Sequence, residues 1–217
     1  AAYADRAMDG SQFTRRNLSL RARRDFSDGG LERLEATLFV NEVDHVMDNY
    51  SLRPFVPSMM MPGRAASNPD RLTYGARVLA KMTPGTESAW AFSSGLDYQF
   101  NRHRVRSTAN QLTDPYGAKA RIKDAELSVA GLFSEATWAL SESRRWVSGL
   151  RFDSWKAQDH RSTVATGMMG ATINPTAGNV RRTLLPSAFV RYEQDLKKGF
   201  SVFVGLGHTQ RFPDYWE

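Results

Sequence analysis

The sequence predicts an all-β fold: an eight-strand arc of a transmembrane, antiparallel, up-and-down β-barrel. Short polar turns at residues 27–30, 83–86, 141–144 and 196–199 alternate with long polar loops at 50–70, 106–121 and 159–180. Loops of this length are uncommon in a compact soluble domain. Tight turns at one end of a sheet and long loops at the other are typical of outer-membrane barrels.

Eight segments between these turns and loops alternate apolar and polar residues with a period of two. They are residues 18–23, 34–41, 72–81, 90–100, 124–129, 149–153, 188–193 and 200–209. Because successive side chains of a strand point to opposite faces, we expect one set to face lipid and the other the lumen. The sets expected to face lipid are Leu18, Leu20 and Ala22; Leu34, Ala36, Leu38 and Val40; Leu72, Tyr74, Ala76, Val78 and Ala80; Trp90, Phe92, Leu96, Tyr98 and Phe100; Ala125, Leu127 and Val129; Leu150 and Phe152; Ala188, Val190 and Tyr192; and Phe200, Val202, Val204 and Leu206.

The main alternative is a soluble β-sandwich, in which the same apolar faces would form a buried core. Strand length argues against it, because the segments 31–47 and 89–106 far exceed the usual length of about 5–6 residues in soluble proteins. Trp90, Trp138 and Trp146 also lie beside the short turns, where a barrel carries an interfacial aromatic girdle. Both features favour the barrel.

The composition is compatible with this fold and excludes little else. No run approaches the 18 or more apolar residues of a membrane helix, but a spanning strand needs only about 9–11 alternating residues. The net charge of +6 is spread along the chain without a block of Lys or Arg, and no basic helix or aromatic-basic motif points to nucleic acid. The absence of cysteine excludes disulfide bonds in this segment.

The ends of the sequence predict that residues 1–217 form part of a barrel domain that is incomplete at both ends. The chain starts at Ala1 without an initiator Met and stops at Glu217, shortly after a strand pattern. An open arc in lipid would leave backbone N–H and C=O groups unpaired at both edges. We therefore expect the rest of the same protein to pair with both edges and to complete a wider barrel.

His45 and Met47 are the candidate metal ligands. They continue the register of Glu35 and Asn41, so they are expected on the lumenal face, about 7 Å apart along the strand. Imidazole and thioether together suit copper, especially Cu(I). The alternative is that His45 is an ordinary polar residue of the lumen.

Methionines in the long loops are candidate accessory ligands. Five of the eight methionines lie there: Met59, Met60, Met61, Met168 and Met169. Methionine normally fills cores, and a solvated loop has no core to fill. The loops either pack their methionines on one another or offer weak thioether sites that lead a soft metal towards His45.

The other motifs are less informative. His103 and His160 stand among charged residues and are expected to be solvated, whereas His208 follows the lipid-facing register of Leu206. The sequence has no Gly-rich phosphate loop, no paired-carboxylate site with a clear geometry and no G-x-S-x-G motif. It therefore predicts that the protein is not an enzyme.

Three stretches resemble TonB-dependent outer-membrane receptors, in particular their copper-receptor branch: residues 3–11, 41–50 and 209–217. The resemblance implies a 22-stranded barrel in the bacterial outer membrane, closed by an N-terminal plug and energised by the inner-membrane TonB complex. In that branch a Cys-x-x-x-Met of the plug is thought to meet a His-x-Met of the barrel. Of these two motifs, only the His-x-Met of the barrel can be carried over, onto His45 and Met47. This chain contains neither the plug nor a cysteine.

The leading hypothesis is uptake of copper ions, as Cu(I) or Cu(II), across the outer membrane. The expected partners are the plug and remaining strands of the same receptor, the TonB complex and outer-membrane lipids, with no nucleic acid. One alternative is a receptor for a ferric siderophore or another metal chelate, which would need a pocket lined by aromatic residues and arginine. The others are a passive pore or surface-binding protein, in which His45 and Met47 would be incidental, and an outer-membrane hydrolase.

Overall fold

The computed structural model describes residues 8–27, 29–59, 61–85, 87–166, 170–197 and 199–212. Within them lie ten strands and one short 3₁₀ helix. These are β1 (Asp9–Asp25), β2 (Leu31–Asp48), β3 (Ala66–Met82), β4 (Trp90–Thr108), η1 (Tyr116–Ala118), β5 (Ile122–Ser141), β6 (Arg144–Asp159), β7 (Thr163–Thr166), β8 (Gly170–Ile173), β9 (Val180–Asp195) and β10 (Ser201–His208). The described residues include no helix long and apolar enough to cross a membrane.

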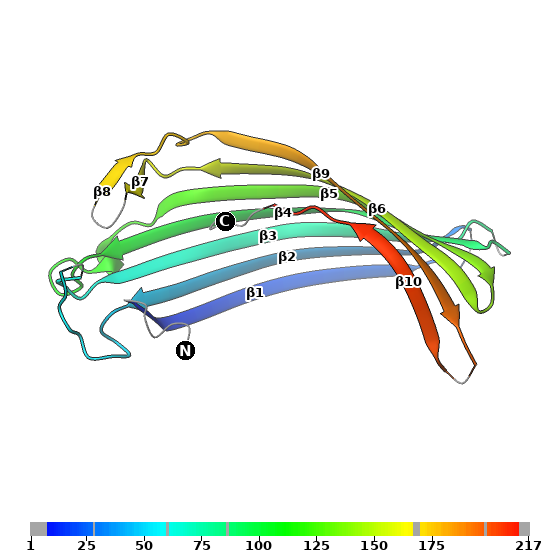
Figure 1. Ribbon diagram of the computed structural model, residues 1–217, viewed down its shortest axis with the longest axis horizontal. Coiled ribbons are helices and arrows are strands. Elements are labelled where there is room, and N and C mark those ends of the chain that lie inside the picture. Colours follow the sequence, from blue (N-terminus) through cyan, green and yellow to red (C-terminus); the bar gives the residue numbers. More distant parts are fainter. Residues whose placement is uncertain are drawn as a thin grey trace.

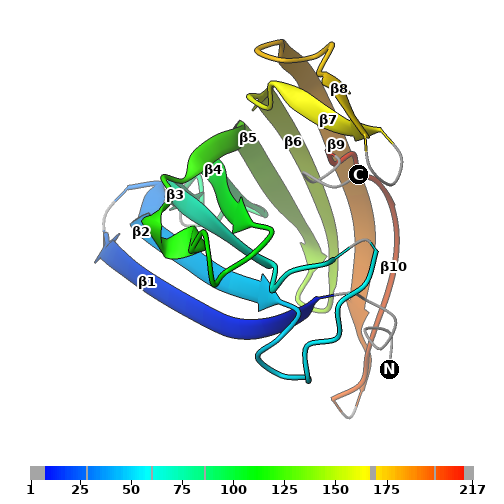
Figure 2. The ribbon, with the colours of Figure 1, turned by 90° about the vertical axis from the view of Figure 1, so that its left-hand side faces the viewer.

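Eight of the strands form one antiparallel sheet in the order β1-β2-β3-β4-β5-β6-β9-β10. Each strand pairs with its neighbours along the chain apart from the β7–β8 hairpin, which interrupts the third long loop and was not predicted. The sheet curls into an open trough whose edges are β1 and β10 (Figures 1 and 2). The predicted eight-strand, up-and-down arc is thus confirmed.

The long loops lie at one end of the trough and the short turns at the other (Figure 1). Gly29 and Gly85, in the first two turns, have φ angles of +84° and +83°. Only glycine adopts this left-handed conformation without a steric cost. The two glycines therefore let the chain reverse within a few residues.

The convex face of the trough is apolar. On β10, Val204 is 70% exposed and Leu206 is 81% exposed, as expected for side chains that would meet lipid. The rest of the predicted set on this segment, Phe200 and Val202, is exposed as well. Away from this edge strand, Leu38, Leu96 and Leu132 on the same face are 56%, 56% and 61% exposed. A sandwich would have buried them, so the exposure supports the barrel.

The aromatic girdle lies at the short-turn end of this convex face. Trp90 stands directly opposite Trp138, which stands opposite Trp146, which in turn stands opposite Tyr192. The rings of Trp90 and Trp138 stack with centroids 5.4 Å apart, and those of Trp146 and Tyr192 are 5.2 Å apart. One row of aromatic side chains thus crosses four strands.

The prediction for β5 was wrong in its choice of face. Leu127 and Val129 were expected to face lipid, but they stand opposite Asn101 and Gln99 on the concave face. The outward residues of this strand are instead Ala130 and Leu132, opposite Tyr98 and Leu96. Both faces of β5 contain apolar residues, so alternation alone did not identify the outer one.

On the concave face, ion pairs join β6 to β4 across the intervening strand β5. Arg151 on β6 donates hydrogen bonds to both carboxylate oxygens of Asp97 on β4, at 2.9 and 2.8 Å, and also to Asp153. The intervening residue on β5 is Gly131, and a Cβ there would collide with these groups. Charged side chains therefore meet across β5 because glycine leaves the space for them.

Candidate metal centre

His45 and Met47 lie at the long-loop end of β2, on its concave face. Phe13 stands directly opposite His45 on β1, and Ser67 opposite Met47 on β3. The pairing of β2 with β3 keeps one register from Arg33 to Asp48, so alternation places both side chains on the side that also carries Glu35 and Asn41.

This end of β2 extends beyond the apolar band. On the convex face the side chains change from Leu18 and Val40 to Arg16 and Glu42, whose charged groups lie 3.8 Å apart. His45 comes three residues further along β2. It therefore lies outside the segment that would span lipid.

The environment of His45 favours the neutral imidazole. Partial burial lowers the pKa of His45, and the nearby charge of His103 lowers it further, against the opposing effect of Asp44. The ring of Phe13 stands beside the imidazole, with centroids 6.1 Å apart. A neutral imidazole is the form that binds a metal ion.

His103 was expected to be solvated, and this expectation was wrong. It is only 8% exposed, and its Nδ1 lies 2.6 Å from a carboxylate oxygen of Asp124. It lies on the concave face, opposite Arg71. His160 is likewise held by Glu126, at 3.0 Å, whereas His208 faces outward opposite Ala188, as predicted.

A polar network holds the backbone of His45. It lies on the convex side of β2 and β3, beyond the apolar band. Asn68 donates to the carbonyl oxygen of His45 at 2.9 Å and to Asp44 at 2.6 Å. Arg121, at the end of the second long loop, donates to Asp44 and Asn68, each at 2.7 Å.

Asp70 completes this network. It stands directly opposite Asp44, and Arg121 and Arg104 both bond to its buried carboxylate. Burial alone would raise the pKa of Asp70, but the hydrogen bonds from the two guanidinium groups outweigh it and lower the pKa. Arg121 therefore bridges the two facing carboxylates of Asp44 and Asp70 beside His45, and that of Asp70 stays charged.

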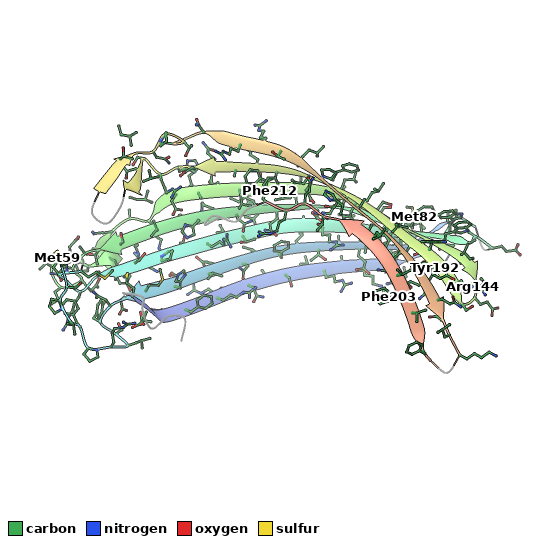
Figure 3. The ribbon with its side chains drawn as sticks, in the orientation of Figure 1. Met59, Met82, Arg144, Tyr192, Phe203 and Phe212 are labelled. Atoms are coloured by element: carbon green, nitrogen blue, oxygen red, sulfur yellow. The ribbon has the colours of Figure 1, made fainter. Side chains whose placement is uncertain are left out.

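The loop methionines differ in their surroundings. Met59 is 90% exposed and lies at the far long-loop end of the molecule (Figure 3). The Sδ of Met61 accepts a hydrogen bond from Asn49, with a separation of 3.7 Å from Nδ2. Asn49 follows β2 two residues after Met47, so this bond brings a loop thioether close to the candidate centre. Met60, Met168 and Met169 fall outside the described residues.

Within the described residues, His45 and Met47 would supply only part of a metal coordination shell. In the part of the chain that the structure describes, no three or more His, Asp or Glu side chains are grouped to hold a metal ion. His45 and Met47 offer one nitrogen and one sulfur donor. A closed site would need further donors from outside these residues.

Comparison with solved structures shows what the whole arc is similar to. Copper transporter OprC superposes with a TM-score of 0.88 at 41% sequence identity, over 97% of this chain and 33% of that chain. The ferric-catecholate import receptor Fiu from E. coli K12, in its open form, superposes with a TM-score of 0.60 at 12% identity, over 93% of this chain and 36% of that chain. The second likeness shows the fold alone.

The chain therefore spans about a third of the length of the solved structures it matches. No curated protein matches the sequence. The family described as TonB dependent receptor-like, beta-barrel matches residues 2–217. The chain thus belongs to the TonB-dependent receptor family and forms part of its β-barrel.

Proposed function

We propose that this chain is part of an outer-membrane receptor that takes up copper ions, and that His45 and Met47 bind the metal in the lumen. The observation that carries the proposal is the placement of these two side chains on one face of β2, beyond the apolar band. An imidazole and a thioether form a donor pair suited to copper. The similarity to copper transporter OprC over nearly the whole chain supports the same metal.

The remaining parts of the mechanism come from the rest of the receptor. The plug would supply the missing donors, and the TonB complex would supply the energy for release. The loop methionines Met59 and Met61, and with them Met60, Met168 and Met169, would capture copper before it reaches His45. Single thioethers bind loosely, so the metal could pass from one to the next.

Uptake of a metal chelate is the second candidate, because the concave face also holds a pocket suited to one. A cavity of about 390 Å³ is lined by arginine and aromatic side chains, among them Arg71, Arg151 and Trp155. The ring of Phe212 stacks on Trp155 with centroids 3.8 Å apart. Aromatic and cationic walls fit a ferric chelate better than a bare metal ion.

Copper loading of the full-length receptor distinguishes the two candidates. We expect H45A/M47A to lose tightly bound copper, measured by mass spectrometry after loading and desalting. The matched control, H208A/M82A, removes the same two side-chain types from the convex face and should keep wild-type copper. Equal copper in wild type and H45A/M47A would overturn the proposal. Binding of a ferric catecholate by both proteins would then favour the chelate receptor.

A further inference from the structure

Two unpaired cations stand side by side on the convex face. Lys156 on β6 is directly opposite Arg182 on β9, and both side chains are exposed. Within the described residues neither has a hydrogen bond or a carboxylate partner. Like charges directly opposite each other destabilise a pair of strands, so this arrangement calls for an anion.

The position of the pair identifies where that anion would be. Lys156 lies ten residues along β6 from Trp146, and Arg182 lies ten residues along β9 from Tyr192. At about 3.4 Å per residue and a tilt of about 45°, ten residues rise ~24 Å along the barrel axis. This matches the height of the apolar band, about 25 Å. Since the girdle marks one boundary of that band, the cations mark the other, at the long-loop end.

A small pocket adjoins the pair. It has a volume of about 40 Å³ and is lined by Phe100, Ser128 and Lys156. Glu126 and Gln158, one row nearer the long loops, also line it. The carboxylate of Glu126 already has partners: the ammonium group of Lys123 lies 3.1 Å from it and the ring Nε2 of His160 lies 3.0 Å from it. The positive charge of Lys156 and Arg182 is therefore left uncompensated.

A third cation on the same face, Arg102, has an unsatisfied hydrogen-bond donor. Arg102 stands opposite Glu126, one residue pair above Phe100 and Ser128. Its Nε atom is buried and has no hydrogen-bond partner among the described residues. A buried donor without a partner costs free energy, which an anionic oxygen would relieve.

We propose that Lys156, Arg182 and Arg102 bind the phosphate groups of an anionic glycolipid in the outer leaflet. The apolar row immediately below, which includes Tyr98, Ala130 and Leu184, would receive its acyl chains. The cations would contact the lipid headgroup, and the apolar row next to them, on the side of the short turns, would contact its acyl chains. The site lies on the face opposite His45, so it is independent of copper binding.

The test uses the full-length receptor in detergent, titrated with lipid A and followed by native mass spectrometry. Wild type should bind bisphosphorylated lipid A at least tenfold more tightly than the dephosphorylated lipid. K156Q/R182Q should bind lipid A about 30-fold more weakly, since each cation near an anionic headgroup contributes about a factor of five. Millimolar inorganic phosphate should not displace the lipid.

Two variants keep this test interpretable. R24Q/R144Q removes the same charge from the convex face at the short-turn end and should bind lipid A like wild type. K156R/R182K keeps the charge and should also bind normally, even if K156Q/R182Q does not fold. Equal binding of the phosphorylated and dephosphorylated lipids by wild type would overturn the proposal. So would equal loss of lipid A in R24Q/R144Q and K156Q/R182Q, or displacement by free phosphate.

Discussion

Gly149 on β6 lies beneath the ring of Phe189, the residue directly opposite it on β9. The same relationship recurs on the concave face: a Cβ at Gly75 would stand 2.6 Å from Cζ of Phe39, and one at Gly95 would stand 2.7 Å from Cζ of Phe133. In each case the phenylalanine comes from the neighbouring strand and covers a glycine that has no side chain of its own. Large rings thus lie flat along the lumen wall.

Replacing Gly149 with alanine should therefore destabilise the barrel. The added methyl group forces the Phe189 ring from its place, at a cost of about 1–3 kcal/mol. Unfolding in urea, followed by the loss of heat-modifiable gel mobility, measures the effect. G207A is the control, because its Cβ would meet only ordinary contacts, 3.4 Å from Cβ of the same Phe189. Equal stability of the two variants would contradict this account.

The alternation of residues predicted most strand faces but not that of β5. On β2 the apolar side chains, such as Leu34 and Leu38, occupy one face, and the other face is mostly polar, with Glu35 and Asn41. The alternation therefore identified the lipid-facing side of β2. On β5 Leu127 and Val129 are apolar at one end of the strand, and Leu132 has the opposite parity further along. The neighbouring strands decide the matter through register, and no single strand contains that information.

Copper binding should persist below the pH at which an exposed histidine would lose it. The pKa of His45 is lowered by burial and by His103, so protons compete for the imidazole only at a lower pH than the ordinary value of about 6.5. Copper retention from pH 7.5 to 5.0 measures this. H103A should raise the pKa of His45 and move the loss of copper to higher pH. An unchanged profile in H103A would show that the two histidines are not coupled.

The environment of His103 could not be predicted from its neighbours in the sequence. Arg102 and Arg104 flank it, and such a stretch predicts a solvated segment. Its partner Asp124 lies on the next strand, where the pairing of β4 with β5 shifts register between His103 and Arg104. The irregularity brings the two side chains together, and the sequence contains no local signal for it.

Removing Arg121 should release the second long loop from the strands. Arg121 is the residue through which residues 109–121 hold Asp44, Asn68 and Asp70, and R121A leaves two facing carboxylates without that bridge. We expect faster hydrogen exchange and protease cleavage in 109–121, while the barrel stays folded. R71A, which removes an arginine from the concave face of β3, is the control. Unchanged exchange in R121A would refute the anchoring role.

The same anchor should weaken in acid. The pKa of Asp70 is lowered in the folded protein, so its contribution to stability is fully present above the unfolded value of about 3.9 and is lost as the pH falls through the folded value. Exchange in residues 109–121 should thus rise below about pH 4 in wild type. In D70N the loop should be mobile at neutral pH and show a smaller acid response. A wild-type loop that stays protected at pH 2 would contradict the prediction.

The loop methionines should affect the rate of copper capture more than the final binding. Replacing Met59, Met60 and Met61 by leucine removes three thioethers while keeping most of the apolar volume. We expect copper to load several-fold more slowly at low concentration, with wild-type content at saturation, because each exposed thioether binds singly. Stopped-flow loading of the full-length receptor measures both. A loss of copper at saturation would place one of these residues, with Met61 the first candidate, in the main site.

The stacked pair of Trp90 and Trp138 gives this part of the barrel its own optical signature. Their rings are nearly parallel, at 4°, with centroids 5.4 Å apart, a separation at which the excited states of two indoles couple. The residues lie 48 positions apart in the sequence (138 − 90) and meet only when β4 and β5 have joined in their final register. The circular-dichroism couplet of the two indoles should therefore appear late in membrane insertion, and it reports registration of this hairpin without any label.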